Sequence, residues 1–157
     1  MKVIIIEDEL LAQAKLETML VSLDSSIEVM AKISSAKDAL NWLSENPAPD
    51  LAFVDIQLSD DHSFEIFRRH PVSFPVIFTT AYDKYLLESF EFNSIDYLLK
   101  PITEEKLKRA LDKVKKLAQH FLQGNLLETI QRFDYGRKRI LAKKGTEFVA
   151  LEFDDAA

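Results

Sequence analysis

The sequence predicts an α/β fold, a doubly wound parallel sheet with helices on both faces. Short apolar runs rich in Val, Ile and Phe alternate five times with longer amphipathic runs, a pattern typical of parallel strands joined by right-handed helical crossovers. The runs at 3–6 and 51–54 are apolar at every position, as expected for strands buried on both faces. The length of 157 residues fits one such domain with an appendage.

The first two strand–helix repeats occupy residues 3–45. The strand at 3–6 leads into a helix at 9–23, and the strand at 27–33 leads into an amphipathic helix at 36–45. In the first helix the apolar residues recur near the helical period. These residues are Leu10, Leu11, Ala14, Leu16 and Met19.

The third and fourth repeats follow the same scheme. The strand at 51–54 precedes a short helix at 63–69, and the strand at 75–80 precedes a helix at 83–92. Their apolar, β-branched and aromatic content predicts strands, and the longer periodic runs predict helices.

The fifth repeat joins a strand at 95–99 to a long helix that begins at Thr103. This helix keeps a 3.6-residue apolar stripe for about twenty residues, or ~30 Å, whereas a strand of five residues spans only about 17 Å. Its distal part should therefore project beyond the sheet as a connector or a dimer surface. The stripe comprises Leu107, Ala110, Leu111, Val114, Leu117, Ala118, Phe121 and Leu122.

A C-terminal extension follows this helix. Residues 123–138 are predicted to be a linker, and 139–143 and 147–151 to form a β-hairpin. Because a two-stranded hairpin is marginally stable alone, residues 139–157 are expected to open a second, incomplete domain. A tail docked on the first domain is the alternative.

Composition excludes several classes of protein. Hydrophobic residues make up 47% of the chain, so it has material for a core. The absence of cysteine excludes a disulfide scaffold, a thiolate zinc site and a cysteine nucleophile. The start has no secretory signal, and no apolar stretch approaches the ~18 residues of a membrane span. We therefore expect a cytoplasmic protein without a membrane partner.

Charge is divided unevenly along the chain. Residues 1–99 carry 7 basic and 17 acidic side chains, whereas residues 100–157 carry 13 and 9. The acidic N-terminal part is suited to bind cations, and the basic C-terminal part is suited to bind polyanions or an acidic partner. An unevenly charged, solvated surface is the alternative.

Polar residues collect where four of the five strands end. Glu7-Asp8-Glu9 follow the first strand, Asp55 the third, and Lys100-Pro101 the fifth, while Thr80 closes the fourth. In open parallel sheets, ligands bind outside the carboxyl ends of the strands. If the second strand is an edge and the other four are neighbours, these side chains share one crevice.

Alone, each of these residues has an ordinary explanation, such as acids that complement a helix dipole. Asp55 is harder to explain, because a carboxylate after a buried run costs free energy unless it is paired or bound to metal. Together the residues fit one chemistry. Clustered carboxylates suit Mg²⁺, while a lysine ammonium and a threonine hydroxyl suit a phosphoryl group. The set predicts phosphoryl transfer to a carboxylate nucleophile.

Four motifs occur in one order: Ile6-Glu7-Asp8-Glu9, Val54-Asp55-Ile56-Gln57-Leu58, Phe78-Thr79-Thr80-Ala81-Tyr82-Asp83 and Ile95-Asp96-Tyr97-Leu98-Leu99-Lys100-Pro101. Because of these four motifs and their order, residues 1–122 resemble the receiver domain of a bacterial two-component response regulator. The resemblance implies a flavodoxin-like (βα)5 fold with strand order 2-1-3-4-5.

The resemblance also implies roles for individual residues. Asp55 would be the phosphoacceptor, taking a phosphoryl group from a sensor histidine kinase. Glu7 and Asp8, with Asp55 and the main-chain carbonyl of Gln57, would hold Mg²⁺. Since Glu7 is longer than the aspartate often found there, its contact with the ion would run through water.

The remaining roles concern the response to phosphorylation. Thr80 would bind the phosphoryl group, Lys100 would pair with it, and Tyr97 would be the aromatic side chain that turns inward. The peptide bond between Lys100 and Pro101 would be cis. The face formed by the fourth helix, the fifth strand and the fifth helix would then support a homodimer.

The C-terminal part refines the resemblance. Thr80–Asp83 and Asn93–Ile102 resemble receivers coupled to a LytTR-type DNA-binding domain, which implies control of transcription. Arg139–Gly145 resembles the first strands of that domain. Because only the start of that domain is present, DNA binding is expected of the full-length protein alone. Ser59 and Ser63 replace a proline and a glycine of many receivers, which is expected to loosen the loop after Asp55.

Two other functions stay open from the sequence. One is a Mg²⁺-dependent phosphatase that works through an aspartyl-phosphate, although Gln57 stands where such an enzyme would need a general acid–base. The other is an inactive pseudo-receiver that serves only as an interaction module. The complete set of acids with the lysine argues against it.

Overall fold

A five-stranded parallel sheet with strand order β2-β1-β3-β4-β5 forms the centre of the computed structural model, which describes residues 1–122. The predicted fold class and strand order are therefore confirmed. The predicted linker and hairpin lie outside the described residues. The strands are β1 (Lys2–Ile6), β2 (Glu28–Ile33), β3 (Leu51–Asp55), β4 (Val76–Thr80) and β5 (Ser94–Leu99). The helices are α1 (Leu10–Leu23), α2 (Ala36–Glu45), α3 (Phe64–Arg69), the 3₁₀ turn η1 (Asp83–Tyr85), α4 (Leu86–Ser89) and α5 (Glu104–Leu122).

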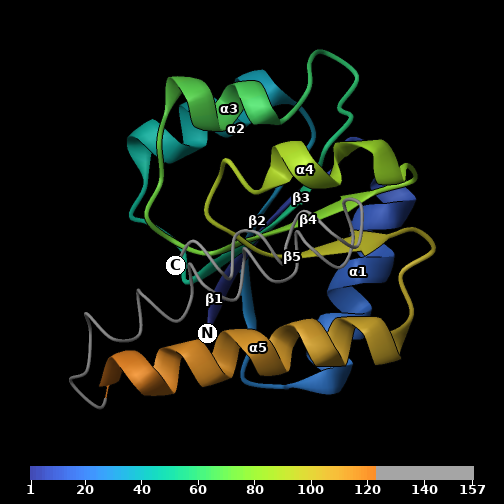
Figure 1. The fold of residues 1–157 in the computed structure, drawn as a ribbon, viewed down its shortest axis with the longest axis vertical. Helices are drawn as coiled ribbons and strands as arrows, with labels where there is room; N and C mark the ends of the chain where they lie inside the picture. Colours follow the sequence, from blue (N-terminus) through green and yellow to red (C-terminus); the bar gives the residue numbers. More distant parts are fainter. Residues whose placement is uncertain (123–157) are drawn as a thin grey trace, which may run out of the picture.

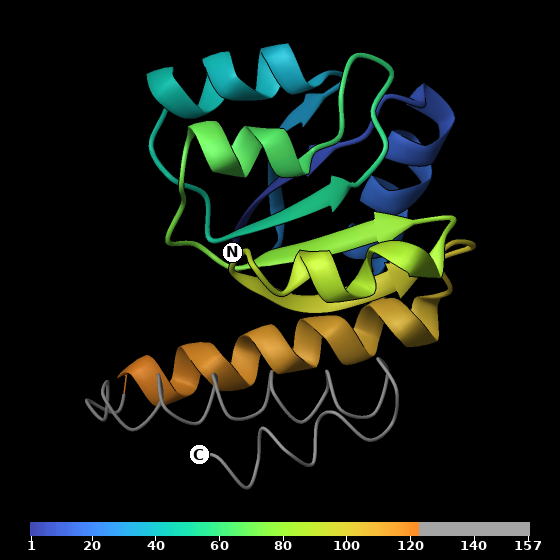
Figure 2. The same cartoon turned by 45° about the horizontal axis from the view of Figure 1, so that its top comes forward.

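Helices cover the sheet on both faces, as Figures 1 and 2 show. α2 and α3 pack on one face around Phe64, Phe67 and Phe78, while α1 and α5 pack on the other around Leu20 and Leu107. Every residue of β3 and β4 is buried. Because both faces are covered, these central strands are apolar throughout except where they end.

The buried stripe of α1 differs from the prediction. Leu10 and Leu11 are 70% and 80% exposed. The helix buries Leu16, as predicted, together with Gln13 and Leu20. The side chain of Gln13 finds polar partners in the interior, which is why a polar residue can occupy this face. The first turn of α1 therefore presents leucines to solvent next to the strand ends.

The predicted helix at 83–92 is replaced by η1, the four-residue α4 and a tight turn. After α4, the main-chain N–H groups of Phe90 and Phe92 donate to carbonyls three residues back, those of Leu87 and Ser89. The Ser89 hydroxyl also donates to the Leu86 carbonyl. Bonds of this 3₁₀ type, with a serine bonded back to the main chain, tighten and end an α-helix.

α5 matches its prediction closely. Thr103 caps it by accepting the main-chain N–H of Lys106 (3.2 Å), and the buried residues among 104–120 run from Leu107 to Val114. Beyond that point Ala118 is exposed, and Figures 1 and 2 show the C-terminal end of the helix extending past the sheet. None of the helices described for residues 1–122 combines the length and apolarity needed to cross a bilayer.

Candidate functional site

Three carboxylates meet at the carboxyl ends of two neighbouring strands. β1 pairs with β3, with Ile6 opposite Val54, so Glu7 and Asp8 emerge beside Asp55, the last residue of β3. One carboxylate oxygen from each of the three acids lies within 4.8 Å of the others. Within residues 1–122 this is the one group of metal-ligating side chains found that close together.

Lys100 joins this cluster from the end of β5. Its Nζ donates to Glu7 Oε2 (2.8 Å) and to Asp55 Oδ2 (3.0 Å). The peptide bond that follows, to Pro101, is cis, as the resemblance implied. Two residues more than ninety positions apart, Glu7 and Lys100, thus form a direct ion pair because the sheet topology aligns their strand ends.

Burial and charge act differently on the two partners of this ion pair. Burial raises the pKa of Glu7 to about 7, because the hydrogen bond from Lys100 offsets only part of the lost hydration and the charge of Asp55 adds to the rise. At Lys100 burial alone would lower the pKa, but the bond to Glu7 and the charge of Asp55 raise it. The lysine therefore stays charged, and the Glu7 carboxyl holds a proton more readily than an exposed glutamate does.

Glu7 is also fixed by contacts from α1. Its Oε1 accepts the main-chain N–H of Glu9 (3.1 Å), and its main-chain carbonyl accepts Gln13 Nε2. Gln13 Nε2 also donates to Ser34 Oγ (3.2 Å). The sequence argument missed Gln13, although a polar residue on the inner face of a helix is a readable signal.

The donor set fits Mg²⁺, which prefers carboxylate and carbonyl oxygens and keeps several waters. Asp55 binds Lys100 through Oδ2, and its Oδ1 accepts the main-chain N–H of Gln57 (3.2 Å). Both oxygens of Glu7 accept hydrogen bonds as well, and because its side chain is one methylene longer than that of an aspartate, it is suited to contact an ion through water. Asp8 is half-buried and offers a carboxylate directly.

The loop after Asp55 is tied down at several points. Asp60 accepts the main-chain N–H groups of Ala36 (2.9 Å) and Lys37 (3.1 Å) at the start of α2, and the first of these bonds lowers the pKa of Asp60. The Ser63 N–H donates to the Ile56 carbonyl (2.8 Å). Asp60 thus provides an anchor for a loop in which serines replace the proline and glycine.

The predicted switch residues lie on the adjoining strands. Thr80, at the end of β4, is buried and accepts the main-chain N–H of Tyr82 at Oγ1 (3.2 Å). The hydroxyl of Tyr97, on β5, donates to the carbonyl of the same Tyr82, and burial raises the pKa of Tyr97 to about 12. Tyr82 therefore connects the two residues through its main chain.

The family model for the response regulator receiver domain matches residues 3–112. The chain belongs to this family. The match spans all five strands and reaches well into α5, so it covers every element that contributes to the site.

The curated relatives include sensory transduction proteins. The chain is 40% identical over 124 residues to sensory transduction protein LytT of Bacillus anthracis, covering 76% of this chain and 49% of that protein. It is 32% identical to LytT of Bacillus subtilis over 162 aligned residues, covering 99% of this chain and 63% of that protein. The chain thus spans about half the length of the first of these relatives, and the relatives agree with a LytTR-type receiver.

Solved structures share the fold. The response regulatory domain of protein MrkE from Klebsiella pneumoniae superposes with a TM-score of 0.66 at 29% identity, covering 74% of this chain and 96% of that one. A response regulator receiver domain (CheY-like) from Methylobacillus flagellatus gives 0.60 at 22% identity, covering 72% and 97%.

The sequence prediction and the structure agree on the centre of the site and differ at its edge. Glu7, Asp8, Asp55 and Lys100 converge as predicted. Besides Gln13, the sequence argument missed Tyr85, whose hydroxyl contacts the Gln57 side chain. Nothing in the local pattern identified this tyrosine, because its contact depends on how η1 lies against the loop.

Proposed function

We propose that this protein is a two-component response regulator whose receiver accepts a phosphoryl group on Asp55 from a sensor histidine kinase. The observation that carries this proposal is the Lys100 ammonium placed on both Glu7 and Asp55, with Asp8 beside them. A structural domain has no need of three clustered acids, whereas an acceptor of phosphoryl groups needs a nucleophile, a cation site and a mobile ammonium.

In the proposed transfer step, the carboxylate of Asp55 is the nucleophile. One carboxylate oxygen of Asp55 attacks phosphorus in the phosphohistidine of the kinase; a P–O bond forms, the P–N bond breaks, and the imidazole nitrogen keeps the electron pair. Mg²⁺ would be held by Asp8, Asp55 and the Gln57 carbonyl, with Glu7 through water, and would neutralise the charge that develops on the phosphoryl oxygens.

Lys100 and Thr80 complete the site after transfer. Lys100 already binds Asp55 Oδ2, and it would exchange its carboxylate partners for an oxygen of the new phosphoryl group. The Thr80 hydroxyl would turn from the Tyr82 N–H to donate to another oxygen. As Thr80 moves, Tyr97 would leave the Tyr82 carbonyl and turn inward, and the segment after the cis Pro101 would adjust with it.

Modification by acetyl phosphate in the presence of Mg²⁺ tests this proposal. The wild type is expected to gain one phosphoryl group per chain, seen as a mass increase in intact-protein mass spectrometry. Asp55→Asn should gain none, and Asp61→Asn, in the loop after Asp55, should be modified like the wild type. Equal modification of all three proteins would contradict the proposal, and repeated turnover of a small phosphoester would contradict it in favour of the phosphatase alternative.

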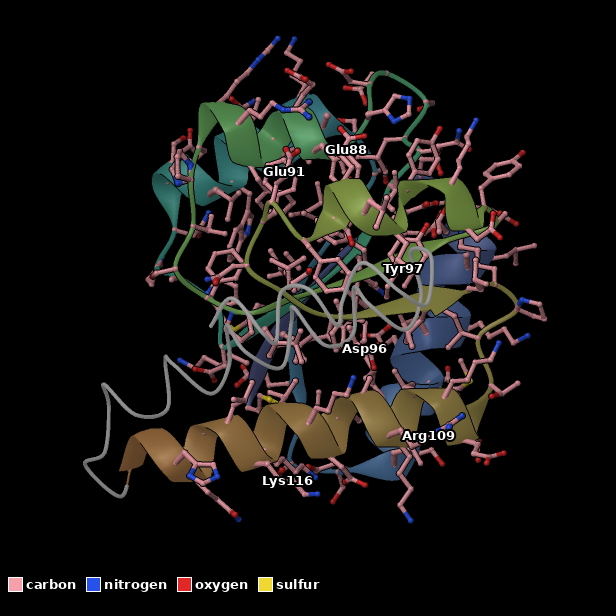
Figure 3. All side chains as sticks on the ribbon, in the orientation of Figure 1. Glu88, Glu91, Asp96, Tyr97, Arg109 and Lys116 are labelled. Atoms are coloured by element: carbon pink, nitrogen blue, oxygen red, sulfur yellow. The ribbon has the colours of Figure 1, made fainter. Side chains whose placement is uncertain are left out.

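We also propose that phosphorylation promotes a homodimer through the α4–β5–α5 face. Figure 3 shows Glu88 and Glu91 on the α4 side of this face, Arg109 and Lys116 on α5, and Asp96 with Tyr97 between them. A face with an acidic half and a basic half is complementary to a second copy of itself about a two-fold axis.

Charge reversal tests the dimer face. With beryllofluoride and Mg²⁺, Arg109→Glu should weaken dimerisation measured by sedimentation, while Lys37→Glu on α2 makes the same charge change on another face and should leave it unaltered. An unaffected dimer in Arg109→Glu would contradict this face.

We further infer that residues 1–122 form the receiver, 123–138 a linker and 139–157 the beginning of a LytTR-type DNA-binding domain that controls transcription in the cytoplasm. Alignment with the Bacillus subtilis relative continues over 99% of this chain, past residue 112 where the receiver match stops. Fluorescence anisotropy with promoter DNA should show no specific binding by residues 1–157. Specific binding by this chain would contradict the assignment of DNA binding to the full-length protein alone.

A further inference from the structure

Gln57 faces the site with its main chain and η1 with its side chain. Its main-chain N–H donates to Asp55 Oδ1 (3.2 Å), and its carbonyl is the main-chain ligand in the proposed function. Its Nε2 donates to the hydroxyl of Tyr85 (2.9 Å). The Tyr85 hydroxyl therefore fixes one end of a residue whose other end contacts the phosphoacceptor.

Tyr85 is itself held by its ring. The ring lies edge-on to His62, with centroids 5.3 Å apart, and to Phe64, with centroids 6.3 Å apart. Gln57 and His62 pair in an isolated antiparallel bridge, so Tyr85 contacts both ends of the loop that starts after the phosphoacceptor. Because the ring is packed on two sides, its hydroxyl offers Gln57 an acceptor in one fixed place.

We propose that Tyr85 is a positioning residue for phosphoryl acceptance, which holds the Gln57 side chain and thereby the direction of the Gln57 main chain toward Asp55 and the ion. The inference rests on the proposed function. The peptide groups on either side of Gln57 each keep one other main-chain hydrogen bond, so a free Gln57 side chain would change their tilt without releasing them. The carbonyl would then be aimed less well at the ion, and the N–H less well at Asp55.

The contact is specific to the hydroxyl, so a single-atom change separates it from packing. Tyr85→Phe keeps the ring contacts with His62 and Phe64 and removes only the acceptor of the Gln57 amide. Gln57→Met keeps the length of the side chain and removes the donor. The two variants therefore delete the same hydrogen bond from opposite sides.

The first measurement is made on metal-free protein. In ¹H–¹⁵N NMR spectra, Tyr85→Phe should shift the side-chain amide of Gln57 and also its main-chain N–H, while the thermal unfolding temperature in EDTA stays within experimental error of the wild type. If the main-chain N–H of Gln57 does not shift, the hydroxyl does not direct the main chain and the proposal is wrong.

The second measurement adds the ion. Tyr85→Phe should weaken Mg²⁺ binding about three- to tenfold, the range expected for one lost hydrogen bond. Phosphorylation by acetyl phosphate should slow by the same factor at low Mg²⁺ and recover at saturating Mg²⁺. Unchanged Mg²⁺ affinity would overturn the proposal.

A double-mutant cycle completes the test. Tyr85→Phe combined with Gln57→Met should be no worse than either single variant, because both remove one bond. Additive losses would overturn the proposal. Failure of the proposed function would be seen separately, as modification of Asp55→Asn by acetyl phosphate, and would leave the metal-free NMR result in place.

Discussion

The two halves of the site are held by different forces. The acidic half, formed by Glu7, Asp8 and Asp55, follows buried strands and is bound by a shared ammonium at 2.8 and 3.0 Å. The switch half, formed by Thr80 and Tyr97, is bound through the main chain of Tyr82 by single hydrogen bonds. One half is held by opposite charges, and the other by single hydrogen bonds to one main chain, although Thr80 is itself buried.

The difference extends to the surrounding elements. β3, which delivers Asp55, is buried at every residue, whereas the segment after Thr80 is a 3₁₀ turn and one short helix with no buried residue in η1. Segments with few buried apolar contacts change conformation at low cost. The comparison teaches that Asp55 is placed by the core, whereas the segment that follows Thr80 begins with a turn that has no buried residue.

Removing the shared ammonium should have the largest effect. Lys100→Met leaves Glu7 and Asp55 facing each other without a cation, so we expect the free energy of unfolding in EDTA to fall by about 2–3 kcal/mol. Mg²⁺ should restore more stability to the variant than to the wild type, because it replaces the missing charge. Urea unfolding with and without Mg²⁺ measures both effects.

Lys113→Met is the matched control. Lys113 Nζ lies 3.4 Å from Asp96 Oδ2, and the lysine side chain is 44% exposed. Loss of this ion pair should therefore lower the free energy of unfolding by less than about 1 kcal/mol. If Lys100→Met and Lys113→Met lose equal stability, the acidic half of the site is held no more strongly than an ordinary surface ion pair.

The pH dependence of stability tests how strongly burial acts on Glu7 in the acidic half of the site. Because burial raises its pKa from 4.5 to about 7, the folded state binds a proton more tightly than the unfolded state. Stability in EDTA should therefore decrease as the pH rises from about 4.5 to about 7, with about 2–3 kcal/mol from this group. Glu7→Gln should flatten this part of the plot of unfolding free energy against pH. If the slope is unchanged in the variant, the pH dependence comes from another group.

The anchor of the loop should contribute less. Asp60→Ala removes the acceptor of two main-chain N–H groups at the start of α2, so we expect a loss of about 1 kcal/mol. Since the pKa of Asp60 is lowered, its contribution is present above the unfolded pKa and is lost as the pH falls through the lower folded value. Asp61→Ala, whose carboxylate accepts the N–H of the adjacent His62, is the control and should lose less.

The smallest effect is expected in the switch half. Tyr97→Phe removes only the hydroxyl bond to the Tyr82 carbonyl, which should lower the free energy of unfolding by about 0.5 kcal/mol. Hydrogen exchange of residues 82–92 should nonetheless increase, because this bond ties η1 to β5. A loss as large as that of Lys100→Met would contradict the difference between the two halves.

Most of the fold and the centre of the site could be predicted from the sequence. The alternation of runs predicted the sheet, and the strand-end positions of Glu7, Asp55 and Lys100 predicted their convergence. The prediction failed where local periodicity was misleading. Leu10 and Leu11 have helical spacing but lie outside the buried stripe, and the helix predicted at 83–92 is broken by 3₁₀ bonds and the back-bonded Ser89.

The sequence by itself determined which side chains are available for the site and at which end of the sheet they lie, because parallel strands place their carboxyl ends along one edge. Only the tertiary structure decided how those groups are held: the two carboxylates on one ammonium, the Asp60 cap on α2 and the Tyr85 hydroxyl on Gln57. These contacts join residues 24 to 93 positions apart by the packing of separate elements. Packing of that kind leaves no periodic trace along the chain.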